Sequence, residues 1–461
     1  MNLPSAFAEQ TVSAIGKDEY KKLEEALQQE SPVSIRVNSQ FSTLHSPLNK
    51  VPWCTGGYYL DERLTFTFDP LFHAGCYYVQ EASSMFVEQV LKKYVTEPVT
   101  MLDLCAAPGG KSTHARAVLP EGSLLVANEV IRNRSQILAE NLIKWGHPDV
   151  VVTNNDPADF KDLGAFFDVI LTDAPCSGEG MFRKDPVAVA EWSLDNVNIC
   201  WQRQRRIIAD IWRNLKPGGI LIYSTCTYNI KENEENIEWI INEYGGEPLM
   251  VDILPEWGIT GNLQGKNIPV YHFFPHKTKG EGFFLAALRK PIDAPAEYYR
   301  AGRNKKKQDK PLPVPKQAQQ WLLHPDDYFI EVKGTSVIAF PKSYNEELAA
   351  LRNTLKLLHA GITLGEIKGK DLIPDHSLAM SSALNPSAFP MLEVTYEQAI
   401  AYLRKEAITL DAGASRGYVL LTYKNVPLGF VKNIGNRANN LYPNEWRIRS
   451  GYLPEEVKIL A

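Results

Sequence analysis

Short apolar runs alternate with stretches of helical periodicity from Met101 onward. The runs are rich in Leu, Val and Ile, and they read "MLDLC" (101–105), "SLLVAN" (123–128), "DVVVTN" (149–154), "FDVILTD" (167–173) and "ILIYST" (220–225). Near-continuous apolar runs are typical of strands buried on both faces, and strands that alternate with helices favour a parallel sheet. The pattern predicts an α/β fold with a Rossmann-like core.

Two of the intervening segments have the spacing of amphipathic helices. Leu138, Leu142 and Trp145 recur at i, i+4 and i+7, which predicts one helix with a buried face. A second helix has its apolar positions at Val197, Trp201, Ile208, Ile211 and Leu215. We expect this second helix to end at "KPGG" (216–219), whose glycines lead into the next strand.

The composition of the chain changes after "GEGFFLAALRK" (280–290). The segment "RNKKKQDKPLPVPK" combines a Lys/Arg cluster with prolines, which indicates a solvated linker over residues 291–318. "SSALNPSAFP" (381–390) then divides the remainder into two small units, 319–385 and 386–461. The last unit mixes basic residues with aromatic ones such as Tyr418 and Trp446, a combination that suits RNA and that a plain small β domain also permits.

Whole-chain composition excludes few functions. The chain has 461 residues, 22% of them charged, and a net charge of -5, as in many globular proteins. No long apolar run and no signal-peptide pattern occur, so we expect a cytoplasmic protein without membrane association. The six cysteines lack C-x-x-C spacing, which favours free thiols and predicts neither disulfides nor a metal site.

A glycine-rich turn, "DLCAAPGGKSTH" (103–114), follows the first strand of the predicted sheet and opens a helix. Backbone N–H groups there are expected to face a ligand. The end of the turn resembles a phosphate-binding loop, but Cys105 replaces the leading glycine and Pro108 opposes a tight wrap. S-adenosylmethionine is the better candidate, because Glu129 and Asp156 follow the next two strands, where they are expected to meet its ribose and its adenine amino group.

Two cysteines follow the fourth and fifth strands, Cys176 in "TDAPCSGEG" and Cys226 in "STCTYNIKENEEN". If these strands are neighbours, both thiols face one crevice beside the cofactor turn. Methylation of a pyrimidine at carbon 5 needs such groups, because a thiolate first adds to carbon 6 and a second group helps to release the product. Asp173 is expected to stabilise charge at ring nitrogen 3, and N–H groups of the helix after Cys226 are expected to help ionise it.

These motifs together resemble the Nop/Sun family of RNA cytosine-5 methyltransferases. The resemblance runs from about Arg36 to Leu288, and it includes "SIRVN", "YYVQEASS" and "GEGFFLAAL". The segment "PLGFVKNIGNRANNLYPNEWRIRSGYLP" resembles the PUA-like RNA-binding tail of bacterial RsmF-type enzymes that modify 16S ribosomal RNA. One departure is His272 in "HFFPH", where arginine is expected in the family.

The resemblance implies a role for each candidate residue. The T-C-T-Y thiol, Cys226, attacks the base, and the P-C thiol, Cys176, assists release, with Asp173 near the base. The implied cofactor-binding residues are Cys105, Ala106, Ala107, Pro108, Gly109, Gly110, Lys111, Glu129, Asp156 and Asp173. Arg36 and Asn38 either contact RNA or have a structural role.

We therefore expect an S-adenosylmethionine-dependent cytosine-5 methyltransferase of 16S ribosomal RNA, acting on the naked RNA or within the 30S subunit. The expected parts are an N-terminal RNA-binding region (1–75), the catalytic domain (76–290), the linker, and two C-terminal modules, of which the second is PUA-like. A monomer is expected, with no metal. The alternatives are a transfer-RNA enzyme of the same chemistry and an inactive RNA-binding assembly factor.

Overall fold

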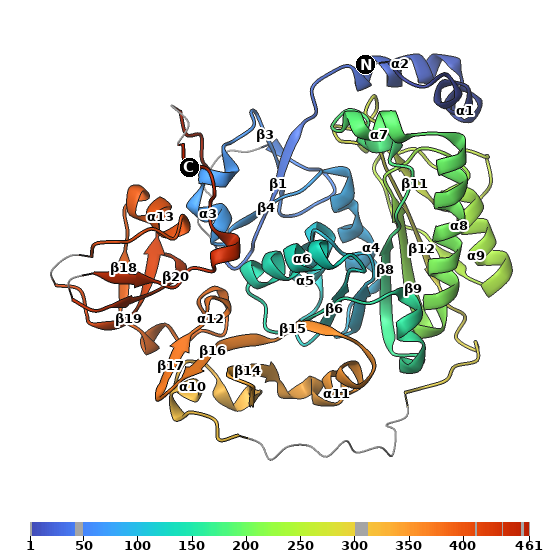
Figure 1. The fold of residues 1–461 in the computed structure, drawn as a ribbon. Coiled ribbons are helices and arrows are strands. Elements are labelled where there is room, and N and C mark those ends of the chain that lie inside the picture. The colour runs from blue at the N-terminus through green and yellow to red at the C-terminus, as the bar shows by residue number, and fades with distance from the viewer. Residues whose placement is uncertain are drawn as a thin grey trace.

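The computed structural model describes residues 2–41, 49–299, 312–410, 413–435, 437–452 and 456–460. The middle of the expected linker, residues 300–311, lies outside the described residues. The described residues form four sheets, of which the largest lies at the centre of the molecule (Figure 1). Within these ranges no helix has the length and apolar character that crossing a membrane requires.

The central sheet contains all five strands predicted from the apolar runs. Its order is β10-β12-β9-β8-β5-β6-β7-β15, with β11 paired to β12, and β5 to β9 run parallel to one another. The strands are β5 Thr100–Asp103, β6 Leu124–Asn128, β7 Val150–Thr153, β8 Phe167–Asp173, β9 Leu215–Thr225, β10 Glu247–Leu249, β11 Tyr271–Phe273, β12 Phe283–Arg289 and β15 Leu357–Ala360. The predicted Rossmann-like core is confirmed.

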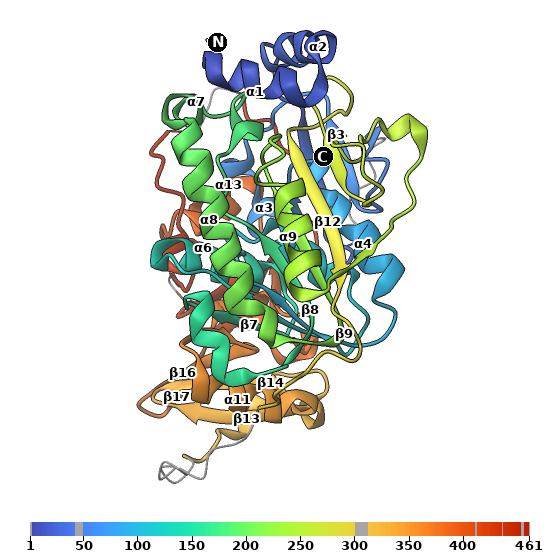
Figure 2. The same ribbon diagram turned by 90° about the vertical axis from the view of Figure 1, so that its right-hand side faces the viewer.

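Helices cover both faces of this sheet, which explains why its strands are apolar throughout. Met101 and Val169 face one cluster with α4, α5 and α6, whereas their neighbours Leu102 and Ile170 face the opposite cluster with α8, α9 and α11. These helices are α4 Val87–Tyr94, α5 Gly110–Val118, α6 Arg132–Trp145, α8 Leu194–Ile211, α9 Glu234–Tyr244 and α11 Asn345–Thr354. Figure 2 shows α8 and α9 in front of β8 and β9.

The two helices predicted from periodicity are α6 and α8, but α8 ends earlier than expected. It stops at Ile211, and "KPGG" belongs to the first half of β9. The buried side chain of Asn214 donates hydrogen bonds to the carbonyls of Phe160 and Gly164, at 2.7 and 2.9 Å. These long-range bonds fix the chain in a non-helical course before the glycines are reached.

The N-terminal part combines two helices with a small sheet. The helices are α1 Ser5–Ile15 and α2 Lys17–Leu27, and the sheet has the order β2-β3-β1-β4 with β1 Val33–Val37, β2 Asn49–Lys50, β3 Gly57–Leu60 and β4 Tyr77–Val79. Helix α1 lies near α7 (Pro186–Glu191) at the edge of the central domain (Figure 1). Its Phe7 packs against the rings of Phe182 and Trp192.

The first C-terminal unit is joined to the central sheet. Its own sheet has the order β13-β14-β16-β17, with β13 Tyr328–Lys333, β14 Ser336–Pro341, β16 Ile362–Lys368 and β17 Asp371–Pro374, preceded by α10 (Lys316–Gln320). Between β14 and β16, the strand β15 leaves this sheet and pairs antiparallel with β7. The unit therefore completes one edge of the central sheet.

The second C-terminal unit shares a core with the N-terminal sheet. It contains α13 Tyr396–Leu403 and a sheet of β18 Met391–Glu393, β19 Gly417–Tyr423, β20 Val426–Asn433 and β21 Ala438–Asn440. The helix α12 (His376–Met380), near the end of the first unit, packs against β20. Ile35 and Tyr77 of the N-terminal sheet lie in the same apolar cluster as Tyr402 and Tyr442 of this unit, together with α3 (Pro70–His73). The two ends of the chain are thus packed against each other.

Candidate active site

A cleft of about 1790 Å³ opens at the carboxyl ends of β5, β8 and β9. The N-terminal segment 28–34 and the loop 275–283 form further walls of the cleft. Eight of the residues predicted from the sequence line it: Cys105, Ala106, Ala107, Pro108, Gly110, Lys111, Asp173 and Cys226. Parallel strands bring these residues together because their carboxyl ends meet at one edge of the sheet.

The glycine-rich turn connects β5 to α5 with its backbone close to the cleft. Gly109 has a φ of 113°, which a residue with a side chain rarely adopts, and an added Cβ would lie 3.3 Å from Leu138. Two side chains of α6 fix the turn: Arg134 donates to the carbonyl of Ala107 and Asn141 to that of Pro108. The turn is held in place by the helix behind it, so its small residues leave space on the cleft side.

Asp103, at the end of β5, is a candidate that the sequence reasoning missed. It lines the cleft, its Oδ2 accepts a hydrogen bond from Ser112, and its buried Oδ1 has no partner among the described residues. Burial raises the pKa of Asp103 to about 7, and the charge of Asp173 adds to this shift. The position of Asp103 at a strand end directly before the glycine-rich turn is the sequence signal that could have identified it. Its unpaired oxygen is suited to accept a hydrogen bond from a ligand.

Glu129 and Asp156 lie after β6 and β7, as predicted, but neither is among the described residues that line the cleft. Glu129 is buried, and it accepts from the N–H of Ile131 with Arg134 at 3.4 Å. Asp156 is half-exposed and caps the 3-10 helix Pro157–Leu163 through the N–H of Ala158. Cofactor binding by both acids stays a prediction.

Asp173 forms the centre of a polar contact on the cleft wall. Its Oδ2 accepts from the ammonium of Lys111 at 2.8 Å, and its Oδ1 accepts from the hydroxyl of Ser224 at 2.7 Å. Burial acts to lower the pKa of Lys111, but Asp173 and the nearby Cys226 outweigh it, so the pKa of Lys111 is raised. The cleft therefore contains a fixed positive charge close to Cys226.

The two predicted thiols are adjacent but differ in their surroundings. Their Sγ atoms lie 3.1 Å apart, and the backbone N–H of Cys226 donates to Cys176 Sγ at 3.3 Å. Cys226 lines the cleft, whereas Cys176 is not among its described lining residues. The hydrogen bond with Cys226 and burial raise the pKa of the Cys176 thiol, so Cys176 keeps its proton and is able to donate it to Cys226 Sγ.

Two buried carboxylates fix the loop that carries Cys226. Glu179 accepts the N–H groups of Tyr228 and Asn229, at 2.8 and 3.0 Å, and Glu232 accepts from Ser177 and Asn229. The expectation that helix N–H groups after Cys226 help ionise it is wrong. Helix α9 begins only at Glu234, and the nearer N–H groups are taken by Glu179.

Three further residues singled out from the sequence, Arg36, Asn38 and His272, are buried and bonded within the protein. Arg36 is buried, with its guanidinium bonded to Gln80 and Thr113 and stacked 4.3 Å from the Trp145 ring. Asn38 is buried and donates to the carbonyls of Gly75 and Trp145. For both residues the structure favours the structural alternative. His272 pairs with Glu234 at 2.8 Å, fully within the core.

Family models match three parts of the chain. Residues 89–289 match the model described as 16S rRNA methyltransferase RsmB/F, residues 3–82 match the N-terminal domain of 16S rRNA methyltransferase RsmF, and residues 389–448 match the methyltransferase RsmF PUA domain. The first range contains the cleft motifs, and the other two contain the N-terminal part and the second C-terminal unit.

Curated relatives are similar over almost the whole chain. The ribosomal RNA small subunit methyltransferase F of Klebsiella pneumoniae is 32% identical over 91% of this chain and 91% of its own length. The protein of the same description from Vibrio cholerae is 31% identical over 86% of this chain and 85% of its own. A solved methyltransferase homolog from Pyrococcus horikoshii is 28% identical, covers 62% of this chain and 95% of its own, and has a TM-score of 0.54.

Proposed function

The chain belongs to the RsmB/F family of 16S rRNA methyltransferases, and from this premise we propose that it methylates carbon 5 of a cytosine in 16S ribosomal RNA through a covalent bond to Cys226. It is an S-adenosylmethionine-dependent RNA methyltransferase. The single observation that carries the proposal is the pair of unequal thiols, of which only Cys226 lines the cleft beside the cofactor turn.

The cleft residues fit the cofactor. Asp103 offers an unpaired buried oxygen, and the turn from Cys105 to Lys111 combines small side chains with accessible backbone. We assign Asp103 and the turn to cofactor binding, with Glu129, Asp156 and Asp173 contributing as predicted from the sequence. When bound, S-adenosylmethionine supplies the electrophilic methyl group that carbon 5 of the base accepts.

Cys226 starts the reaction by adding its sulfur to carbon 6 of the cytosine. The new sulfur–carbon bond makes carbon 5 nucleophilic, and the negative charge that develops at ring nitrogen 3 is stabilised by a proton that the hydrogen-bonded pair of Lys111 and Asp173 shares with that nitrogen. The ammonium of Lys111 lines the same cleft as Cys226, and the S–H of Cys176 lies 3.1 Å from the attacking sulfur.

Release requires that carbon 5 loses its proton and that the sulfur of Cys226 leaves carbon 6. The electron pair of the broken carbon–hydrogen bond forms the ring double bond and expels the sulfur. Cys176 assists this step, because its thiol proton lies 3.1 Å from the departing Sγ atom. Once that proton has passed to Cys226, the sulfur of Cys176 is free to accept the proton that leaves carbon 5. The target base leaves its stack to reach the cleft, at a cost of a few kcal/mol that is smallest in a loop.

The test compares single-cysteine variants on a 16S RNA substrate with cofactor. We expect Cys226→Ala to abolish methyl transfer and any RNA adduct, whereas Cys176→Ala retains methylated RNA bound to Cys226 as a denaturant-resistant band. Cys200→Ala, a buried cysteine on α8, serves as the matched control and should behave as the unmodified chain. An adduct mapped to Cys176 in the Cys226→Ala protein would reverse the roles, and no adduct in any variant would refute the covalent route.

A further inference from the structure

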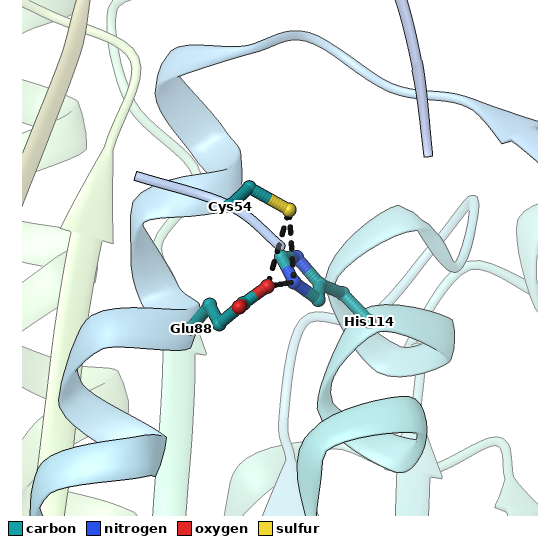
Figure 3. A group of neighbouring side chains, drawn as sticks. All are labelled: Cys54, Glu88 and His114. Atoms are coloured by element: carbon teal, nitrogen blue, oxygen red, sulfur yellow. Dashed lines mark hydrogen bonds and ion pairs between the residues drawn. The ribbon is translucent and has the colours of Figure 1, made fainter. Parts of the chain in front are cut away.

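Three buried side chains outside the cleft form a cluster that the proposed reaction does not use. Cys54 Sγ lies 3.1 Å from Glu88 Oε2 and 3.7 Å from His114 Nε2, and the last two atoms are 2.8 Å apart (Figure 3). All three side chains are buried, with at most 4% of any residue exposed. A thiol, a carboxylate and an imidazole thus converge on one point inside the protein.

We propose that Cys54, Glu88 and His114 bind a single divalent zinc ion. Thiolate sulfur, imidazole nitrogen and carboxylate oxygen are the three ligand types that zinc uses in proteins, and three protein ligands with one water form a common zinc arrangement. The expectation of no metal rested on the absence of C-x-x-C spacing. The absence of that spacing does not exclude this cluster, because Cys54 and Glu88 are 34 residues apart along the chain and Glu88 and His114 are 26 residues apart.

The distances need only a small adjustment to accommodate the ion. Ligand atoms at about 2.0–2.3 Å from a tetrahedral zinc ion lie roughly 3.3–3.6 Å from one another. The contact between Cys54 and His114 already lies near this range, while Glu88 Oε2 has to move outward by a few tenths of an ångström from each partner. On binding, the Cys54 thiol releases its proton to solvent, and the ring proton of His114 occupies Nδ1.

Neighbouring groups hold the carboxylate in position for this role. Glu88 Oε1 accepts from the backbone N–H and the hydroxyl of Thr55 and from Lys92, at 3.0, 2.6 and 2.6 Å, which leaves Oε2 for the cluster. Hydrogen bonds from neighbouring groups to a ligand side chain, such as these to Glu88 Oε1, orient that ligand toward a metal. Lys92 and the buried Arg36 add positive charge nearby, so the three ligands bind a cation against that charge.

The three ligands come from different parts of the fold, so a bound ion would link these parts to one another. Cys54 precedes β3 in the N-terminal sheet, Glu88 lies on α4, and His114 lies on α5, one helical turn after Gly110 of the cofactor turn. A bound ion therefore ties the N-terminal part to the helix that presents the cofactor turn. We expect zinc to raise the melting temperature of the whole chain.

The test uses the full chain, stripped with a chelator and titrated with zinc or with cobalt as a spectroscopic probe. We expect one zinc per chain by elemental mass spectrometry, and a sulfur-to-cobalt charge-transfer band that saturates at one equivalent. Cys54→Ala and His114→Gln should lose the metal and the rise in melting temperature, whereas Cys76→Ala, which removes another fully buried cysteine, should keep both.

The cobalt spectrum of the unmodified chain does not depend on whether a variant folds. Absence of the charge-transfer band in that chain, or zinc retained equally by Cys54→Ala, would overturn the site and leave a hydrogen-bonded core cluster. Neither result bears on methyl transfer, so this proposal and the proposed function fail separately.

Discussion

Glu179 provides the most direct test of how the protein positions Cys226. Its carboxylate is fully buried and accepts five hydrogen bonds, from Gln10, Trp192, the N–H of Tyr228 and both the N–H and the side chain of Asn229. Oε2 takes the two backbone N–H groups and Oε1 takes the three side chains. Glu179 therefore holds the backbone between Cys226 and Asn229 through two N–H groups, while Glu232 accepts from the side chain of Asn229.

The change Glu179→Gln keeps the shape of the side chain and replaces one oxygen with an NH₂ group. In either orientation of the amide, this NH₂ faces at least two donors, so at least two hydrogen bonds to a charged acceptor are lost. Each is worth roughly 1.5–3 kcal/mol, which gives about 3–6 kcal/mol as an upper limit. If only 3 kcal/mol of this falls on the Cys226 loop in the transition state, kcat decreases by about 150-fold.

The assay measures methyl transfer to a 16S RNA transcript under saturating cofactor, together with calorimetric cofactor affinity and the melting temperature. We expect kcat to fall while cofactor affinity stays unchanged, because Glu179 does not line the cleft next to the turn. Trp192→Phe is the matched control, since it removes one donor to Oε1 and leaves both backbone bonds of the loop. A folded Glu179→Gln protein with the kcat of the unmodified chain would refute the positioning role.

Two further predictions concern the C-terminal units. Burial lowers the pKa of His376 to about 3, so the folded state keeps this side chain neutral while the unfolded chain protonates it below pH 6.5. The contribution of His376 to the free energy of unfolding is therefore complete above pH 6.5 and falls by about 1.4 kcal/mol at pH 5.5. Urea unfolding should show a smaller loss between these pH values for His376→Phe. Arg437 is exposed at the turn between β20 and β21, and the exposed Arg416, just before β19, has its guanidinium beside Gly435 of the same turn. Changing both arginines to Gln should weaken RNA binding and reduce its salt slope by about 1.4–1.8, whereas Lys368→Gln with Lys370→Gln should not. An equal effect of both pairs would mean that this turn makes no specific contact.

The strands of the core could be predicted from the sequence because helices cover both faces of the sheet. Every position of β5, β6 and β7 is buried, and a continuous apolar run records such burial directly. The end of α8 could not be predicted in the same way. It depends on Asn214, whose side chain bonds to carbonyls 54 and 50 residues away, and no local pattern carries that information.

Residues at strand ends were predictable for the same topological reason. Asp173 and Cys226 follow neighbouring parallel strands, so the fold class alone brings them to one edge. Glu179 and the cluster around Cys54 were not predictable, because their partners come from α1, α4 and α5 and meet only in the packed structure. The strand β15 was missed as well, since its half-buried residues "LLHA" show no alternation and its partner β7 lies some 200 residues earlier.

The roles proposed for the two thiols depend on the structure as well as on the sequence motifs. Both cysteines follow strands of the same sheet, and their Sγ atoms lie 3.1 Å apart. Position in the fold alone therefore does not distinguish the attacking thiol from the assisting one. Their environments do: Cys226 faces the cleft near the ammonium of Lys111, whereas Cys176 accepts the N–H of Cys226 and retains its proton. An attacking sulfur needs access and a positive neighbour, and an assisting thiol needs a proton to give, so these surroundings support the proposed roles of Cys226 and Cys176.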